Sequence, residues 1–281
     1  MKTIVVTGAN SGIGRSITEQ LLQSKNKVVM VVRDTDKSRE VFEDLKSKFG
    51  AENLQMEFCD LADLTNVKNL ADRLNKFERI NVLINNAGLE MAQRHESAQG
   101  FEMTLAVNYL APFYLTKMLL PKLLQHKGSR IVNTSSLVEK WGNIDFEDMQ
   151  MINSYDPEKA YYRSKLALLL FTYELSRKYS PDQITVNAFE PGMTKTDFSR
   201  DFQGIMKYGS MFMKLFMHSA DVPAKTAVYL ALSDEVSKVT GKNFEDMKEK
   251  ISSETSRDKF LAKKLSEVTE KMLQAKLKNI D

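Results

Sequence analysis

The residue pair best suited to proton transfer is a tyrosine and a lysine one helical turn apart, Tyr161 and Lys165. The apolar run at 166–171 follows them and predicts a buried helix, so both side chains lie on the same side of that helix. A free tyrosine titrates at about pH 10, and a nearby ammonium favours the phenolate. The pair therefore predicts a group that exchanges a proton with an alcohol or carbonyl oxygen near neutral pH.

A second pair with the same spacing, Tyr155 and Lys159, competes with the first. Asp156 and the proline after it are typical of an N-cap followed by the first helical turn. Tyr155 then lies before the helix and does not share a face with Lys159. We therefore choose Tyr161 and Lys165, with Tyr162 as the alternative tyrosine because it lies three residues before Lys165.

Three glycines, Gly8, Gly12 and Gly14, follow a β-branched run at 4–6 and precede a helical apolar pattern. Glycine allows a tight turn and a close approach of a ligand to the backbone. A helix N-terminus carries unpaired N–H groups and a partial positive charge, which suit a pyrophosphate. The spacing is neither Gly-x-Gly-x-x-Gly nor a P-loop, and it predicts a strand, a turn and a nucleotide-binding helix.

A second apolar run at 27–32 predicts a buried strand that ends in Arg33. At this place in a dinucleotide-binding fold, a carboxylate binds a ribose 2′-hydroxyl, whereas an arginine accommodates a 2′-phosphate. We therefore predict NADP(H), with Arg33 on the phosphate and Asn10 or Ser11 assisting, and NAD(H) as the less favoured cofactor. In the alternative, Arg33 is a solvated strand end and Asp34 supplies the carboxylate.

Further motifs follow in order: Asn85-Asn86-Ala87-Gly88 after a strand at 80–84, and Ser135-Ser136 at the end of a strand beginning at 129. Together with the Thr-Gly-x-x-x-Gly-x-Gly turn and Tyr-x-x-x-Lys, they resemble the short-chain dehydrogenase/reductase family. The resemblance implies an α/β fold, a doubly wound Rossmann-type parallel sheet of about seven strands with helices on both faces. We expect one such domain at 1–245 and a C-terminal helical extension packed on it at 246–281.

The resemblance also implies catalytic roles. Ser136 holds the substrate oxygen, with Ser135 as the fallback, and Lys165 also binds the nicotinamide ribose. Asn108 lies four residues before Pro112, where a helix kinks or opens, and the resemblance assigns it a water in a proton relay. Alternatively, Asn108 only satisfies the kinked backbone.

The same resemblance implies a cofactor site along the carboxyl ends of the strands. An aspartate at a strand end binds the adenine amine, unless Asp60 or Asp63 only caps the helix at 64–74. The predicted set is Gly8, Asn10, Ser11, Gly12, Ile13, Gly14, Arg33, Asp60, Leu61, Asn86, Ala87, Gly88, Tyr161, Lys165, Pro191, Gly192, Thr194 and Thr196. Glu190 departs from the small or histidine residue expected there and has no explanation in the sequence.

A long interval between Ser136 and Tyr161, containing Trp141, resembles the retinol dehydrogenase-like and WW-domain oxidoreductase-like branch. We expect an NADP(H)-dependent oxidoreductase for a hydrophobic alcohol or carbonyl, retinol-like, steroid-like or another apolar aldehyde or ketone. The alternative is a catalytically silent, nucleotide-sensing interaction protein. The complete set of Asn108, Ser136, Tyr161 and Lys165 favours the enzyme.

Composition bears on other possible partners and on the location of the protein. The 281 residues carry 40 basic and 37 acidic side chains, net +3, and their scatter does not indicate a nucleic-acid partner. Cys59 is the only cysteine, which predicts a reducing, cytoplasmic location. The three histidines match no metal-ligand spacing. The strand at the start leaves no room for an anchor, and the longest apolar run is too short to span a bilayer.

Two segments have alternative interpretations. The Met- and Phe-rich stretch at 198–220 is a substrate lid, a peripheral membrane contact or a helix packed on the core. The charged helix expected from about 255 carries the apolar stripe Leu261, Leu265, Val268 and Met272. It packs on the body of the protein or, alternatively, forms a homodimer contact.

Overall fold

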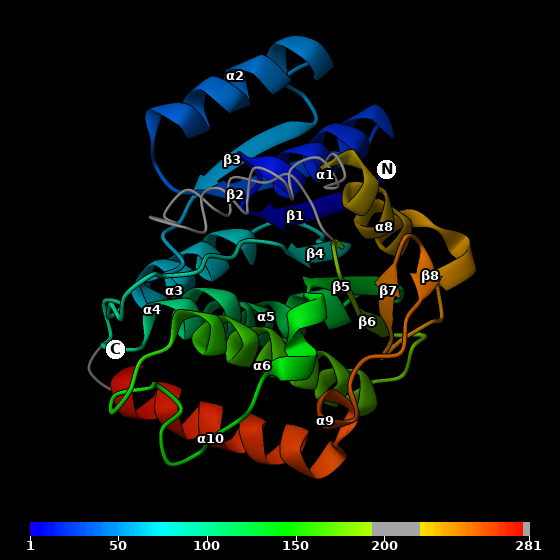
Figure 1. Cartoon of the computed structure of the whole chain (residues 1–281). Helices are drawn as coiled ribbons and strands as arrows, with labels where there is room; N and C mark the ends of the chain where they lie inside the picture. Colours follow the sequence, from blue (N-terminus) through cyan, green and yellow to red (C-terminus); the bar gives the residue numbers. More distant parts are fainter. Residues whose placement is uncertain (193–219, 278–281) are drawn as a thin grey trace, which may run out of the picture.

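The computed structural model describes residues 1–192 and 220–277, which are organised around one sheet (Figure 1). The strand order is β3-β2-β1-β4-β5-β6-β7-β8. Pairs from β3 to β7 are parallel, and β8 pairs antiparallel with β7. The strands are β1 (Thr3–Thr7), β2 (Lys27–Val32), β3 (Leu54–Phe58), β4 (Val82–Asn85), β5 (Ser129–Thr134), β6 (Ile184–Phe189), β7 (Asn243–Glu245) and β8 (Lys248–Glu249).

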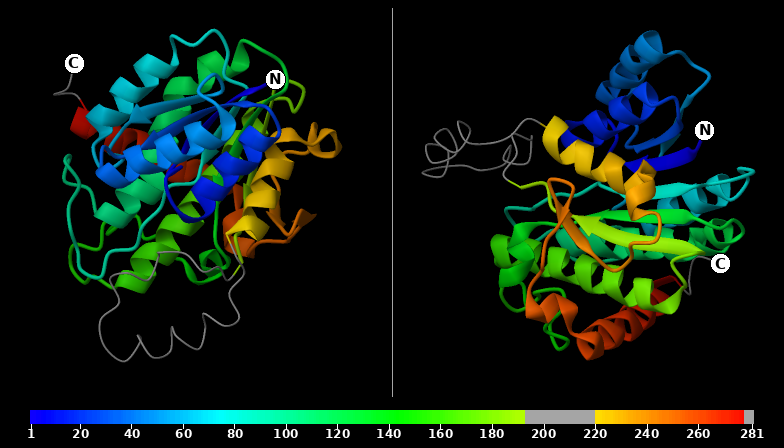
Figure 2. Two further views of the ribbon diagram at one scale, coloured as in Figure 1. Left: turned by 90° about the horizontal axis from the view of Figure 1, so that it is seen from above. Right: turned by 90° about the vertical axis from the view of Figure 1, so that its right-hand side faces the viewer.

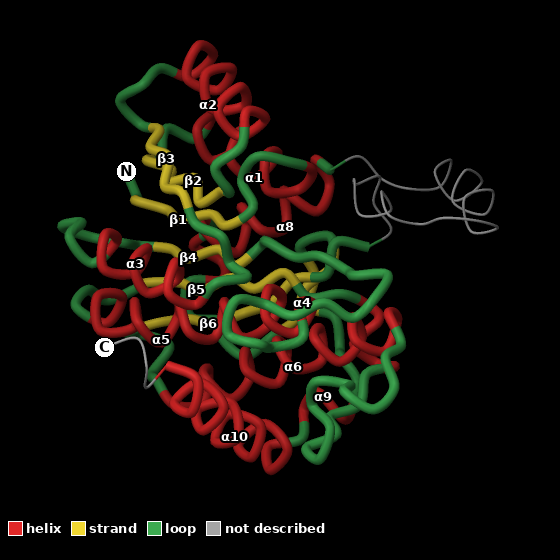
Figure 3. The backbone as a smooth tube through the Cα atoms, turned by 90° about the vertical axis from the view of Figure 1, so that its left-hand side faces the viewer, coloured by secondary structure: helices red, strands yellow, loops and turns green. Residues whose placement is uncertain are grey.

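Helices cover both faces of the sheet, as Figures 1 and 2 show. One face carries α1 (Gly12–Gln23), α2 (Asp36–Phe49) and α8 (Asp221–Leu232); the other carries α3 (Leu64–Leu74), α5 (Ala111–Leu124) and α6 (Pro157–Lys178). Beyond α6 lies α10 (Lys259–Leu277), as Figure 3 shows. Shorter elements are α4 (Met103–Leu105), the π-helix η1 (Ala106–Leu110), the 3₁₀-helices η2 (Leu137–Trp141) and η4 (Asp234–Val236), and α9 (Glu254–Arg257).

Strand alternation explains the two cores. In β1, Ile4 and Val6 belong to the core under α1, α2 and α8, whereas Val5 belongs to the core under α3, α5 and α6. Successive side chains of a strand point to opposite faces, so an unbroken apolar run is buried on both sides. The doubly wound α/β prediction is confirmed, with eight strands among the described residues instead of about seven. The additional strand is the two-residue antiparallel edge β8.

Local capping signals set the helix starts. Asp156 accepts a hydrogen bond from the Lys159 backbone N–H, and Pro157 is the first residue of α6, as predicted. Asp63 caps α3 by accepting from the Thr65 N–H. Tyr155 therefore lies before α6, and Tyr161 and Lys165 lie within it.

The C-terminal helix packs on α6, and its predicted stripe lies on the packed side of the helix. Leu265 is fully buried, and Leu261 and Met272 are partly buried against the core. The fully buried positions also include Ala262, Thr269 and Leu273, which lie one residue further along the chain than the predicted ones. The Thr269 hydroxyl lies 2.7 Å from the buried Tyr109 hydroxyl. A polar side chain thus occupies a core position, which apolar periodicity cannot reveal. The division at residue 245 stays a prediction.

Strand order reverses between β1 and β4, so the turns after these two strands diverge to opposite faces. In open α/β sheets, ligands bind at this point, outside the carboxyl ends of the strands. The segments that follow β1, β4, β5 and β6 meet this edge. None of the helices in the described ranges is long and apolar enough to cross a membrane.

Candidate active site

Tyr161 and Lys165 lie close together on α6. The Lys165 Nζ lies over the Tyr161 ring, 5.5 Å from its centroid. The ammonium donates a hydrogen bond to the Thr134 backbone carbonyl at 2.9 Å, which fixes it at the end of β5. Lys165 is 4% exposed, and burial lowers its pKa to about 8. Near neutral pH, this lysine is therefore mostly an ammonium with a fraction of neutral amine.

Ser136 is the second residue after β5 and is the N-cap of η2. A side-chain hydrogen bond joins Ser136 to Tyr161. The fallback, Ser135, is 1% exposed, and its hydroxyl has no hydrogen-bond partner within residues 1–192 and 220–277. Ser136 is thus the serine that the fold brings to the tyrosine.

The protonation state of Tyr161 differs from the expectation that the ammonium favours a phenolate. Burial raises the pKa of Tyr161 above its usual value of 10, the hydrogen bond with Ser136 lowers it, and the Glu90 carboxylate raises it. Burial dominates, and Lys165 lies over the ring. Tyr161 is therefore a neutral phenol at pH 7, which is the form that can donate a proton to a carbonyl oxygen.

The competing tyrosines face elsewhere. Tyr155 donates a hydrogen bond to the Met91 carbonyl at 2.9 Å. Tyr162 donates to Glu158 at 3.0 Å, and its ring packs against Trp141 with centroids 5.6 Å apart. Both therefore have structural contacts away from Ser136.

Asn108 lies in the π-helix η1, where an opened helical turn was expected before Pro112. Its amide nitrogen donates to the Leu89 carbonyl at 2.8 Å and to Ser164 at 3.0 Å. Its amide oxygen accepts from the Leu89 N–H at 2.8 Å. The side chain therefore bonds the segment after β4 and not the opened backbone of its own helix.

Gly88 marks the point where these groups converge. A Cβ added to Gly88 would lie 3.4 Å from the Asn108 amide oxygen and 3.6 Å from the Lys165 Nζ. The absence of a side chain at this glycine leaves space between the lysine, the asparagine and the chain that follows β4. The four predicted catalytic residues are thus brought together at one edge of the sheet.

The glycine turn is closely packed and suits a pyrophosphate. A Cβ on Gly14 would lie 2.1 Å from the Gly8 carbonyl oxygen and 2.5 Å from the Asn86 amide nitrogen. Gly8 has φ +66°. Ser11, the N-cap of α1, makes no side-chain capping bond within the described residues, and the first turn carries no acidic residue. The backbone N–H groups at the start of α1 are therefore suited to binding an anionic ligand.

Thr7 joins this turn to the segment after β4. Its hydroxyl accepts hydrogen bonds from the backbone N–H groups of Asn86 and Ala87 at 2.9 and 3.0 Å. The Asn86 amide in turn donates to the Thr7 carbonyl at 3.0 Å. The two halves of the crevice are therefore held in register.

Arg33 directly follows β2, and Arg39 of α2 pairs with the nearby Asp34 carboxylate. Arg33 is exposed. Asp34 pairs with Arg39 at 2.7 Å, and the Arg39 guanidinium lies 4.8 Å from the centroid of the Phe58 ring. Ser38 donates to the Arg33 carbonyl at 2.7 Å and accepts from Asn10 at 2.8 Å. Sequence reasoning missed Arg39 and Ser38, because it considered only residues adjacent to the strand end.

The remaining predicted cofactor residues follow the carboxyl ends of β3 and β6. Asp60 is exposed after β3 and accepts from the Ala62 N–H at 3.0 Å, whereas Asp63 caps α3, so capping and the strand-end position belong to different residues. Leu61 is buried. Pro191 and Gly192 follow β6. Thr194, Thr196 and the Met- and Phe-rich stretch lie outside the described residues.

Glu190 now has a structural explanation. It is 4% exposed, accepts from the Asn243 amide at 2.8 Å, and has its second oxygen 3.2 Å from the Lys250 Nζ. Burial raises the pKa of this carboxyl, and Lys250 opposes that effect. Its partners come from β7 and from the segment after β8, too distant in sequence for a local pattern to indicate them.

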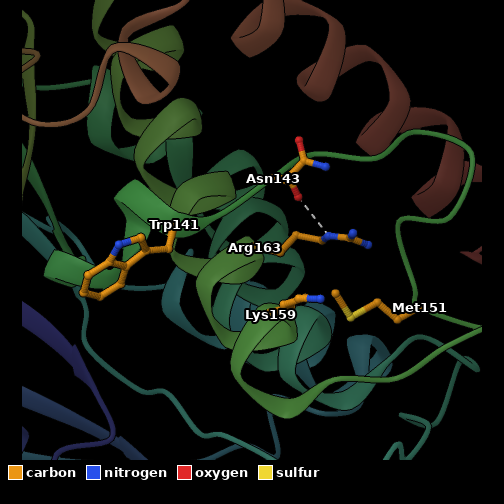
Figure 4. A pocket seen from close by; sticks show the side chains of 5 residues that line it. All are labelled: Trp141, Asn143, Met151, Lys159 and Arg163. Carbon is orange, nitrogen blue, oxygen red and sulfur yellow. Dashed lines mark hydrogen bonds between the residues drawn. The ribbon is translucent and has the colours of Figure 1, made fainter.

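A further pocket of about 280 Å³ lies on the outer side of the first turns of α6 (Figure 4). It is lined by Trp141, Asn143, Met151, Lys159 and Arg163. Arg163 donates to the Asn143 carbonyl at 3.0 Å and also to the Asp148 carbonyl. These bonds hold the long interval before α6 against the helix, and Tyr161 does not line this pocket.

Comparisons with known proteins agree with this geometry. The short chain dehydrogenase family model matches residues 2–204. The chain is 37% identical to retinol dehydrogenase 13 of Mus musculus, over 94% of this chain and 81% of that protein. It is 35% identical to retinol dehydrogenase 14 of Homo sapiens, over 97% of this chain and 86% of that protein.

A solved structure extends the comparison to a bound cofactor. It is a protein from Beutenbergia cavernae, assigned as an NAD(P)-dependent gluconate 5-dehydrogenase, with NADP at low occupancy. It is 27% identical, with a TM-score of 0.71, over 87% of this chain and 94% of that one. By its family match, its relatives and its assembled site, this chain belongs to the short-chain dehydrogenases, oxidoreductases acting on CH–OH and C=O groups.

Proposed function

We propose that this oxidoreductase uses NADP(H) to interconvert a hydrophobic alcohol and its carbonyl, retinol-like, steroid-like or another apolar aldehyde or ketone. The observation that carries the proposal is the convergence of Ser136, Tyr161, Lys165 and Asn108 beside the glycine turn. Relatives named retinol dehydrogenases align with most of this chain, and their names support an apolar substrate.

When bound, the nicotinamide supplies or accepts the hydride. In carbonyl reduction, Tyr161 donates its phenolic proton to the substrate oxygen, and the Ser136 hydroxyl holds that oxygen in place. Lys165, fixed by the Thr134 carbonyl, supplies positive charge beside the phenolate as it forms. Asn108 fixes the segment at Leu89 and Gly88 on the opposite wall. The alcohol oxidation uses the same groups in reverse.

Three observations support NADP(H) over NAD(H). Arg33 is exposed at the end of β2, where a 2′-phosphate would lie. The Asp34 carboxylate pairs with Arg39 at 2.7 Å, which offsets its negative charge beside the end of β2. The Beutenbergia cavernae protein contains NADP.

The test is a fluorescence titration of the full chain with NADPH and with NADH, for wild type and Arg33→Ala. We expect wild type to bind NADPH more tightly, and Arg33→Ala to lose about tenfold in NADPH affinity while its NADH affinity stays constant, because a charge-assisted contact contributes about 1.5 kcal/mol. Arg79→Ala, outside the predicted cofactor set, is the control. Tighter binding of NADH would contradict the proposal.

Turnover is tested on a panel of apolar aldehydes and ketones with bound NADPH. Oxidation of NADPH by at least one of them supports the substrate class, whereas NADPH binding without any turnover favours the nucleotide-sensing alternative. The cytoplasmic location, the homodimer and the division at residue 245 stay predictions of the sequence.

A further inference from the structure

We propose that three residues of the segment after β8, Lys250, Ser252 and Ser253, act as positioning residues for the active site. We call these three residues the C-terminal brace. Each binds a different element that carries part of the catalytic site. The role in catalysis rests on the proposed function, whereas the bracing of the loops does not.

Lys250 fixes the segment that follows β6. Its Nζ lies 3.2 Å from Glu190 and 2.7 Å from Glu245. Glu190 directly precedes Pro191 and Gly192, which belong to the predicted cofactor-binding set. The backbone N–H of Lys250 also donates to the Asn243 carbonyl at 2.8 Å. The charge and the backbone of one residue thus anchor the end of β6 and the adjoining β7.

Ser253 fixes the segment that follows β5. Its backbone N–H and its hydroxyl donate to the two carboxylate oxygens of Glu139, at 2.8 and 2.6 Å. Glu139 is 5% exposed and lies in η2, the short helix that begins at Ser136. Its own N–H donates to the Ser136 carbonyl at 3.1 Å. Ser253 is therefore linked through Glu139 to Ser136, the predicted catalytic serine.

Ser252 binds the catalytic helix itself. Its hydroxyl lies 2.7 Å from the hydroxyl of Tyr173, which is 6% exposed on α6, the helix of Tyr161 and Lys165. Ser256 supplies a further hydrogen bond to Ser252 at 2.8 Å. The same short stretch thus reaches β6, η2 and α6.

The contacts of the C-terminal brace supply partners to two buried carboxylates. Buried carboxylates such as Glu139 and Glu190 are costly unless each is paired or fully hydrogen-bonded. The brace supplies those partners, so each carboxylate holds its loop in one place. Four consecutive residues span at most about 14 Å, which limits how far apart the attachment points can lie. In Figure 1 this stretch of chain runs from β8 to α9, along the side of the molecule where β6 ends.

The first test measures backbone hydrogen–deuterium exchange in the full-length, cofactor-free protein, and it needs no turnover. Ser253→Ala removes one of the two bonds to Glu139, Glu139→Ala removes both, and Lys250→Met removes the cation beside Glu190. Lys117→Met is the matched control, because Lys117 forms an exposed ion pair with Glu270 of α10 at 2.9 Å, away from the site.

We expect Ser253→Ala and Glu139→Ala to accelerate exchange in peptides covering 134–142 by about tenfold or more, and Lys250→Met to do so at 186–192. The control should leave both unchanged, and Ser253→Thr, which keeps the hydroxyl, should restore protection. Unchanged exchange in Ser253→Ala, or an equal acceleration throughout the chain, overturns the brace. Should Glu139→Ala fail to fold, Ser253→Ala decides, because it keeps one of the two bonds.

The second test separates two kinetic effects. Ser253→Ala should lower kcat for carbonyl reduction by about tenfold with an unchanged Kd for NADPH, because small misplacements of a catalytic group are costly. Lys250→Met should raise the Kd for NADPH. Localised exchange effects without turnover on any carbonyl uphold the brace and refute the proposed function; turnover with wild-type kcat in Ser253→Ala refutes the positioning role alone.

Discussion

The substitution Gly14→Ala tests the packing of the nucleotide-binding turn. The added Cβ would lie 2.1 Å from the Gly8 carbonyl oxygen and 2.5 Å from the Asn86 amide nitrogen, well inside the 3.0 Å below which a neighbour must shift. Neither neighbour moves freely, because the Asn86 amide is bonded to Thr7 at 3.0 Å and Gly8 is bonded through its N–H to Val31 at 2.9 Å.

The magnitude follows from two opposing terms. Overpacking costs about 1–3 kcal/mol, and we take the upper end because both contacts involve fixed groups. Alanine gains about 1 kcal/mol over glycine in a helix. The net loss is about 2 kcal/mol, which corresponds to a fall in Tm of roughly 4–8 °C for a domain of this size. The displaced turn should also weaken NADPH binding by about tenfold or more, because we propose that its N–H groups bind the pyrophosphate.

Gly128→Ala is the matched control. Gly128 has φ +78° and nothing within 4 Å of an added Cβ, so it has left-handed strain without a clash. That strain costs about 1–2 kcal/mol. Calorimetry and NADPH titration of both variants separate the two effects: both lose stability, but only Gly14→Ala loses affinity. If Gly14→Ala keeps both Tm and Kd at the wild-type values, the packing described for this turn is wrong.

Two further predictions concern the same crevice. Burial, and then the Glu158 carboxylate, raise the pKa of Glu90 to about 7, from about 4.3 in an unfolded chain. The folded state binds more protons than the unfolded chain between these pH values, so the contribution of Glu90 to stability falls as pH rises from about 4.5 to 7. In Tm measured against pH, Glu90→Gln should remove this part of the pH dependence. If the Tm difference between wild type and Glu90→Gln is the same at pH 5 and pH 8, the prediction is contradicted. Thr7→Val keeps the shape of Thr7 but leaves the N–H groups of Asn86 and Ala87 without their acceptor. We expect a loss of about 2 kcal/mol in urea unfolding, and a loss below about 0.5 kcal/mol would show that these bonds are not important for stability.

Much of the fold was predictable because its signals are local. Asp156 and Pro157 mark the start of α6 in the sequence alone, and so they separate Tyr161 from Tyr155. The position of Pro112 indicated the opened turn at Asn108. Capping, proline geometry and apolar periodicity each depend on residues within a few positions of one another.

The features that were missed depend on partners that are distant in sequence. Glu190 was unexplained because Lys250 and Asn243 reach it only through the sheet. The fully buried position of Thr269 on α10 was missed because its hydrogen-bond partner, Tyr109, lies far away in the sequence. The predicted lowering of the Tyr161 pKa was wrong for a similar reason. The spacing places Lys165 near Tyr161, but burial in the folded protein has the larger effect and raises the pKa.

The most direct test of the central claim is Tyr161→Phe, assayed by NADPH oxidation with an apolar aldehyde that wild type reduces. The variant loses only the hydroxyl that bonds Ser136. We predict that it still binds NADPH, and that its kcat falls by about 10²–10⁴, the usual contribution of a positioned general acid. A kcat close to the wild-type value, with NADPH still bound, would show that another group donates the proton.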